Sequence, residues 1–206
     1  MSNKTRQSYN GPAGHVYDKF KSKNPIERHL MRSFLGAIDD LLQNVNFQNV
    51  LEVGCGEGYI LSQLEERDKN TKIYGSDIDY HISKKAREKA RDCSIFVSDA
   101  THIPLPDNGI DLILGIEMLE HIKYAEDAMR EIQRVARVGA ILSVPREPLW
   151  RMMNMARGKY WRNCGDTPGH CRHWSAGAFE KFVNKYMNVI EIRKPTPWTI
   201  LLANKK

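Results

Sequence analysis

The chain has 206 residues, of which 41% are hydrophobic and 27% charged, with a formal net charge of +6. These proportions are ordinary for a globular protein, and the length predicts one domain with a sizeable core. The positive charge is too weak by itself to indicate nucleic-acid binding. No apolar run approaches the roughly 20 residues that span a bilayer, and the N-terminal fifteen residues show no secretory signal. We therefore expect a cytoplasmic protein whose four cysteines are reduced thiols.

A long amphipathic helix is predicted to precede the first strand. Asn24 can cap this helix, and Pro25 suits its first turn. The apolar residues that fall on one helical face are Ile26, Leu30, Phe34, Ile38, Leu41 and Leu42.

The most informative stretch is VLEVGCGEGYILSQL, from Val50 to Leu64. Its apolar start is typical of a strand buried in a parallel sheet, and its end has the apolar spacing of a helix. Between them lie three glycines, at positions 54, 56 and 58. A strand, a glycine turn and a helix together present backbone N–H groups and a helix N-terminus to a ligand.

Strands and helices continue to alternate after this stretch. A strand over KIYGSD ends at Asp77, which lies 19 positions past Gly58. Alternating strands and helices predict a doubly wound α/β sheet. The later elements are a helix over 82–91, strands over 94–97 and 110–116, a helix over 124–137, a strand over 139–144, a helix from Ser175 to Tyr186, and two final strands joined at 194–197.

Regular patterning is lost from Pro145 to Trp174, apart from a helix expected over 149–157. Long irregular segments in compact domains are often lids or binding loops. Six basic side chains outnumber two acidic ones between 146 and 174, with tryptophan and tyrosine interleaved. This composition suits the binding of an anionic group by arginine, beside an aromatic contact.

The glycine pattern, preceded by Glu52, resembles motif I of the class I S-adenosylmethionine-dependent methyltransferases, E/D-x-G-x-G-x-G. The stretch DATHIPLPDNGIDLI is similar to a second family segment, D-A-x-x-L-P-F-P-D-x-S-F-D. The resemblance extends from roughly residue 25 onward and is strongest for the small-molecule, ubiquinone/menaquinone-methyltransferase-like group. It implies a mostly parallel seven-stranded sheet with an antiparallel C-terminal strand pair, and S-adenosyl-L-methionine as cofactor.

The resemblance also implies roles for single residues. Asp77 is expected to accept the ribose hydroxyls, with Asp79 as the alternative, and Asp99 to accept from the adenine amino group. The full set expected at the cofactor is Glu52, Gly54, Gly56, Gly58, Asp77, Ile78, Asp99, Ala100 and Glu117.

Two interpretations compete for the segment Glu117-Met-Leu-Glu120-His121, which follows the fourth strand. In the first, Glu120-His121 is the structural start of the next helix, as in many relatives without a metal, and His121 acts as the general base with Glu117 as a second catalytic group. In the second, E-x-x-E-H resembles the divalent-metal motif of RNA 3′-terminal 2′-O-methyltransferases and of ubiquinone-pathway O-methyltransferases. We predict no bound metal, because the helix would have to begin at or before Glu117 to align the ligands. His170 and His173 are candidates for a second base or for metal ligands.

We expect a single domain over 1–206, with an N-terminal helical cap over about 1–45 and a lid insertion over about 146–174. The expected function is methyl transfer to a small-molecule acceptor, at an oxygen of an anionic metabolite, sugar or lipid precursor. One alternative is a metal-assisted RNA 3′-terminal 2′-O-methyltransferase, disfavoured because the chain carries no recognisable RNA-binding module. A second alternative is a non-catalytic cofactor-binding protein.

Overall fold

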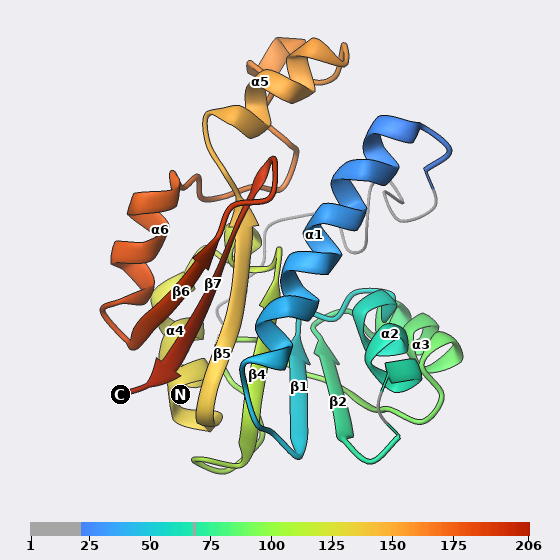
Figure 1. The fold of residues 1–206 in the computed structure, drawn as a ribbon, viewed down its shortest axis with the longest axis vertical. Coiled ribbons are helices and arrows are strands. Elements are labelled where there is room, and N and C mark those ends of the chain that lie inside the picture. The colour runs from blue at the N-terminus through green and yellow to red at the C-terminus, as the bar shows by residue number, and fades with distance from the viewer. Residues whose placement is uncertain (1–21, 68) are drawn as a thin grey trace, which may run out of the picture.

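A computed structural model describes residues 22–67 and 69–206 of the chain (Figure 1). Its centre is a seven-stranded sheet in the order β3-β2-β1-β4-β5-β7-β6. Strand β7 runs antiparallel to β5 and β6, and the remaining pairs are parallel. The predicted doubly wound sheet with an antiparallel C-terminal pair is confirmed. The strands are β1 (Asn49–Val53), β2 (Lys72–Asp77), β3 (Ser94–Val97), β4 (Ile110–Ile116), β5 (Ala136–Pro145), β6 (Met187–Arg193) and β7 (Trp198–Lys205).

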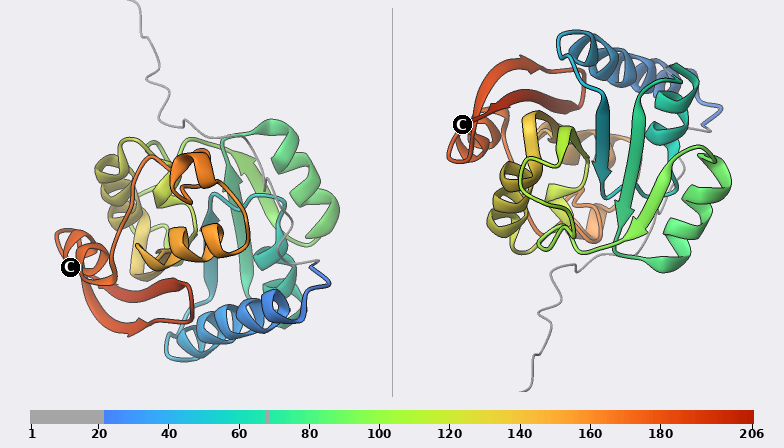
Figure 2. Two further views of the ribbon diagram at one scale, coloured as in Figure 1. Left: turned by 90° about the horizontal axis from the view of Figure 1, so that it is seen from above. Right: turned by 90° about the horizontal axis from the view of Figure 1, so that it is seen from below.

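Helices cover both faces of this sheet (Figures 1 and 2). One face carries α1 (Pro25–Gln43), α2 (Tyr59–Arg67) and α3 (Tyr80–Lys89), whose apolar side chains form one core cluster with the strands. The other face carries α4 (Ala125–Val135) and α6 (Ala176–Val183), which belong to a second cluster. Burial on both faces explains why β4 is apolar along almost its whole length.

Helix α1 begins as the sequence predicts. The Asn24 side chain accepts a hydrogen bond from the Ile26 N–H at 2.9 Å, and Pro25 occupies the first turn. Ile26, expected on the apolar face, is 68% exposed, whereas the Phe34 ring lies 4.5 Å from that of Trp198 on β7. The helix therefore packs on the sheet face. The part of the expected helical cap over 1–21 lies outside the described residues.

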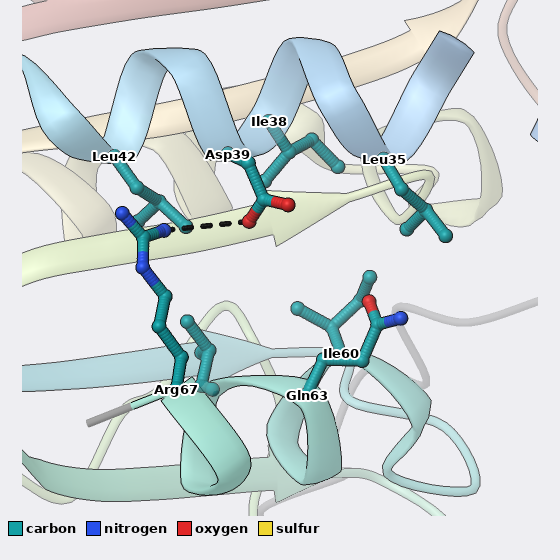
Figure 3. Close-up of a pocket in the computed structure, with 8 residues that line it drawn as sticks. Leu35, Ile38, Asp39, Leu42, Ile60, Gln63 and Arg67 are labelled. Atoms are coloured by element: carbon teal, nitrogen blue, oxygen red, sulfur yellow. Dashed lines mark hydrogen bonds and ion pairs between the residues drawn. The ribbon is translucent and has the colours of Figure 1, made fainter. Parts of the chain in front are cut away.

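A shallow hollow separates α1 from α2 (Figure 3). Aliphatic side chains such as Ile38 and Ile60 line it, and an exposed ion pair joins Arg67 to Asp39 at 3.3 Å. Apart from that pair it contains no acidic or basic side chain, so we assign it to helix packing.

Several element boundaries differ from the sequence prediction, and two of the differences have a clear cause. Helix α3 begins at Tyr80, because Asp79 accepts hydrogen bonds from the N–H groups of the following turn. Helix α4 ends at Val135 and β5 starts at once, because Ala136 already pairs with Ile110 of β4.

The lid segment (residues 146–174) is folded and contains α5 (Leu149–Ala156) and a 3₁₀ turn, η3 (Trp161–Asn163). Seen from above in Figure 2, α5 lies over the carboxyl edge of the sheet. Asn154 Nδ2 donates to Gly165 O at 2.9 Å, and Arg157 pairs with Glu27 of α1 at 3.2 Å. Within the described part of the chain, no helix has the length and apolar character needed to cross a membrane.

Candidate active site

The glycine loop after β1 has a backbone that side chains would not tolerate. Gly54, Gly56 and Gly58 adopt φ angles of +72°, +53° and +75°, in the left-handed region that favours glycine. A Cβ at Gly54 would also lie 2.6 Å from Met118 Cγ. The loop is thus held close to the segment after β4.

Asp77, at the end of β2, fixes this loop. Its Oδ2 accepts from the Gly56 N–H and its Oδ1 from the Asp79 N–H, both at 3.0 Å. Burial raises the pKa of Asp77, and these backbone hydrogen bonds act in the opposite direction. Each carboxylate oxygen keeps a second lone pair, so the group can still accept two hydroxyls. Asp79, the alternative considered for this role, instead caps α3.

Glu52 is a buried carboxyl, 3% exposed, on β1. Its Oε2 has no hydrogen-bond partner among the described residues. Burial, together with the negative charge of Asp77, raises the pKa of Glu52 well above its usual range. A buried carboxyl oxygen without a partner among the described residues suits a ligand with an ammonium group, which fits the amino-acid end of S-adenosylmethionine.

A second part of the site lies at the ends of β2 and β3. Ile78 and Val97 are 39% and 43% exposed, and the strand register places Val97 beside Asp77. Exposed apolar side chains at adjacent strand ends offer a surface for a planar ring. Asp99 and Ala100 follow at once, with Asp99 Oδ1 accepting from the Thr101 N–H and hydroxyl at 2.8 Å each.

Glu117 lies in the turn after β4, where it was expected, with a φ of +51°. Its N–H donates to Ser143 O on β5, and its Oε1 accepts from Trp198 Nε1 at 2.5 Å. The next helical turn, η2 (Leu119–His121), begins two residues later, so Glu117 does not share a helical face with Glu120. The contact with Trp198 links residues 81 positions apart and left no signal in the sequence.

His121 is held by the lid segment. Its Nδ1 lies 3.1 Å from the carbonyl oxygen of Gly169, which can only accept a hydrogen bond. This contact favours the tautomer with the proton on Nδ1, in which Nε2 is the basic nitrogen. The carbonyl oxygen of Glu120 accepts from the Cys171 N–H at 2.7 Å, so the lid backbone is bonded to both Glu120 and His121 of η2.

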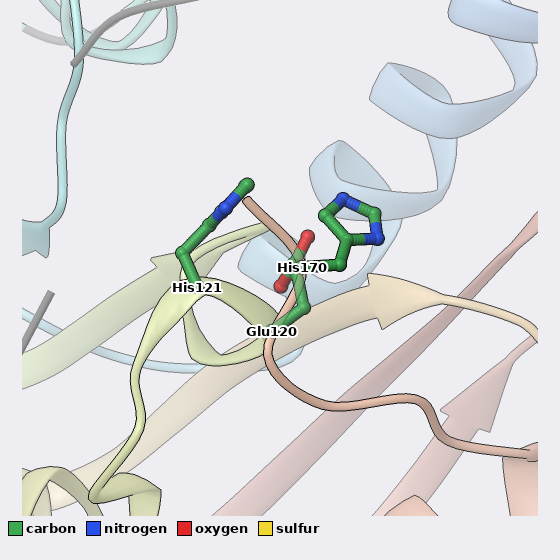
Figure 4. Close-up of side chains that lie close together, drawn as sticks. All are labelled: Glu120, His121 and His170. Carbon is green, nitrogen blue, oxygen red and sulfur yellow. The ribbon is translucent and has the colours of Figure 1, made fainter. Parts of the chain in front are cut away.

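His170 lies beside Glu120 and His121 (Figure 4). Its ring meets that of His121 edge-on, with centroids 4.9 Å apart. Ligand atoms of Glu120, His121 and His170 lie within 4.8 Å of one another. The sequence singled out all three residues but did not indicate that the lid would bring His170 to the other two.

His170 also belongs to a second cluster, with Asp166 and His173, whose ligand atoms lie within the same 4.8 Å limit. His173 Nε2 and Asp166 Oδ1 are 2.7 Å apart. Asp166 was noted in the sequence only as one of two acidic residues in a basic segment.

Several lid arginines expected to face an acceptor instead bind protein groups. Arg151 Nε donates to Cys164 O at 3.0 Å, Arg157 pairs with Glu27, and Arg172 pairs with Glu126 at 2.6 Å. Arg146, at the end of β5, makes no side-chain hydrogen bond or ion pair with any residue the structure describes.

Comparisons with known proteins agree with this geometry. Residues 51–144 match the family model "Methyltransferase domain". A malonyl-[acyl-carrier protein] O-methyltransferase of Hamiltonella defensa is 24% identical over 143 residues, which cover 69% of this chain and 54% of that protein. The chain thus spans about half the length of this curated relative.

Two solved structures share the fold. The PH0226 protein of Pyrococcus horikoshii OT3 superposes with a TM-score of 0.73 at 19% identity, covering 93% of this chain and 97% of that one. The magnesium protoporphyrin IX methyltransferase of Synechocystis, solved with bound SAH, gives 0.66 at 17% identity, covering 90% and 89%. Residues 51–144 thus carry a methyltransferase domain that is similar to those of S-adenosylmethionine-dependent methyltransferases, and this similarity supports S-adenosylmethionine as the cofactor.

We expect Asp77→Ala to weaken the binding of S-adenosylhomocysteine about tenfold or more, because a hydrogen bond to a charged group contributes about 1.5–3 kcal/mol. Isothermal titration calorimetry measures this. Asp79→Ala is the matched control. It removes the cap of α3, which costs about 1 kcal/mol of stability, but it removes no contact that we assign to the ligand. An equal loss of affinity in both variants would reject the ribose assignment.

Proposed function

We propose that the protein transfers the methyl group of S-adenosylmethionine to a hydroxyl oxygen of a small-molecule acceptor held beneath the lid segment. The observation that carries this proposal is the hydrogen bond between His121 Nδ1 and Gly169 O, which makes Nε2 the basic atom. S-adenosylmethionine supplies an electrophilic methyl group. His121 removes the hydroxyl proton as the oxygen attacks, and the site contributes chiefly alignment.

The assignment of residues to the parts of the cofactor belongs to this proposal. Glu52 and the glycine loop hold the amino-acid end, Asp77 the ribose, and Ile78 with Asp99 and Ala100 the adenine. An oxygen acceptor is supported by the curated relative, which its name describes as an O-methyltransferase. A cytoplasmic location is likewise proposed, supported by four cysteines that carry no disulfide.

We further propose an anionic acceptor, such as a phosphorylated or carboxylated metabolite, sugar or lipid precursor. From the sequence we expected several lid arginines to bind the anionic group of the acceptor. In the structure, Arg151 and Arg157 bind groups of the protein itself. Arg146 is the better candidate. It follows β5 directly, at the same sheet edge as Glu117 after β4, and a guanidinium can bind a carboxylate or phosphate with two parallel hydrogen bonds.

A second candidate is metal-assisted methyl transfer, as in RNA 3′-terminal 2′-O-methylation. It is favoured by the proximity of Glu120, His121 and His170. In that mechanism a cation would lower the pKa of the acceptor hydroxyl, and His121 would be a ligand and no longer a base. Against it, Glu117 binds Trp198 and stands outside the cluster.

We expect His121→Asn to lower kcat about 10²- to 10⁴-fold, the usual contribution of a general base, with unchanged affinity for S-adenosylhomocysteine. The assay measures methyl transfer to a panel of hydroxyl compounds. His81→Asn, an exposed histidine at the start of α3, should behave like wild type. Turnover by His121→Asn at the wild-type rate would reject the base. Failure of wild type with every acceptor would instead favour the non-catalytic alternative.

We expect Arg146→Gln to raise KM for an anionic acceptor about tenfold or more, because a charge-assisted contact is lost. KM for a neutral analogue should change little. Arg162→Gln, at an exposed position of the lid segment, is the control. If Arg146→Gln affects neutral and anionic acceptors alike, the residue has no role in charge recognition.

Methyl transfer should persist after exhaustive treatment with EDTA, because the proposed base is an imidazole and not a metal-bound hydroxide. The measurement compares rates in EDTA with rates after addition of Mg²⁺ or Mn²⁺. Activity abolished by EDTA, restored by the ion and lost in Glu120→Ala would establish the metal-assisted candidate in place of the first.

A further inference from the structure

The lid segment carries a compact group of metal-ligand side chains that the methyl-transfer chemistry does not use. Asp166, His170 and His173 come from one stretch of eight residues, and their ligand atoms lie within 4.8 Å of one another. We propose that these three side chains form a site for a divalent transition-metal ion of the Zn²⁺ or Co²⁺ type, which fastens the lid segment.

The geometry is close to what such an ion requires. With metal–ligand bonds of about 2.0–2.1 Å, neighbouring ligand atoms of a tetrahedral zinc site lie about 3.3 Å apart. Asp166 Oδ1 and His173 Nε2 are already 2.7 Å apart, so an ion can replace the proton that they share. Small side-chain rotations bring the third ligand, His170, into place, and a water can complete the tetrahedron.

The donor set selects the kind of ion. Two imidazoles and one carboxylate suit zinc, cobalt, nickel or iron, whereas magnesium and calcium prefer an all-oxygen shell. The site is also open to solvent, since the side chains of His173 and Asp166 are 33% and 30% exposed. An ion can therefore enter without unfolding the lid.

A further carboxyl adds negative charge nearby. Glu147 Oε1 is buried and has no hydrogen-bond partner among the residues the structure describes. The Glu147 N–H donates to Trp174 O at 2.9 Å, directly after His173 in the chain. Burial raises the pKa of Glu147, and the hydrogen bond from the Arg151 N–H acts in the opposite direction. A cation between Asp166 and His173 would offset the charge of both carboxylates.

The overlapping cluster of Glu120, His121 and His170 competes for the same ion, because His170 belongs to both. Two observations favour the lid ligands. Glu120 is only 2% exposed, so its carboxylate is hard for an ion to reach. The lid ligands also come from one short loop, which lowers the entropy cost of assembling them.

Occupancy of the site would stiffen the lid. Thr167, between the ligands, accepts hydrogen bonds from Trp150 Nε1 at 2.9 Å and Asn154 Nδ2 at 3.2 Å, both on α5. Fixing residues 166–173 therefore fixes α5. The edge-on contact of His170 with His121 would at the same time set the orientation of the proposed base.

The test is titration of the purified full-length chain with Zn²⁺ by calorimetry, and with Co²⁺ by visible absorbance. We expect one ion to bind per chain. Asp166→Asn and His173→Asn should each weaken binding at least about tenfold, because the loss of even an outer-shell partner of a metal lowers affinity about ten- to hundredfold. Glu120→Gln and His121→Asn should bind like wild type. His81→Asn is the control for adventitious histidine binding.

The outcomes separate cleanly. Loss of binding in Glu120→Gln and His121→Asn, with Asp166→Asn and His173→Asn unaffected, would overturn the proposal and place the ion in the other cluster. Binding no stronger than adventitious, and equal in all variants, would overturn it as well. Thermal unfolding without metal checks that each variant is folded. The binding measurement requires no acceptor, so its result is independent of the proposed function.

Discussion

The hydrogen bond from the Gly56 N–H to Asp77 Oδ2, 3.0 Å long, is the constraint on which the cofactor half of the site depends. Parallel pairing of β1 and β2, with Val53 beside Ser76, brings the two strand ends to one sheet edge. A left-handed glycine loop is unfavourable for most residues, and a buried carboxylate is costly without donors. Each feature compensates the other, so the loop shape and the buried charge form a single structural unit.

This unit was predictable because its signals are local. Three glycines in a strand–turn–helix pattern and an acidic residue ending the next strand can be recognised without knowing any distant contact. The parallel sheet then brings Glu52 and Asp77 together whatever the rest of the chain does. The same reasoning holds for α1, where an Asn–Pro pair marks the helix start and a period of 3.6 residues marks the buried face.

The part of the site around His121, Glu117 and the lid segment was not predictable from the sequence. Contacts between residues that are far apart in the chain form it. His121 depends on Gly169, Glu117 on Trp198, and the lid on the ion pair of Arg157 with Glu27, which joins residues 130 positions apart. None of these pairs shares a periodic pattern or a turn signal. Three lid arginines illustrate the consequence. The composition of the lid suggested ligand binding, whereas Arg151, Arg157 and Arg172 bind a backbone carbonyl and acidic side chains of the same chain.

The two candidate catalytic groups after β4 can now be distinguished by their partners. Trp198 Nε1 can only donate, and its hydrogen bond to Oε1 fixes the position of the Glu117 carboxyl group. A carboxyl group held in this way is suited to orienting a cationic or hydroxyl group. His121 has the opposite arrangement, because a carbonyl fixes its N–H and leaves a basic nitrogen. We therefore propose proton removal by the imidazole and electrostatic orientation by the carboxylate.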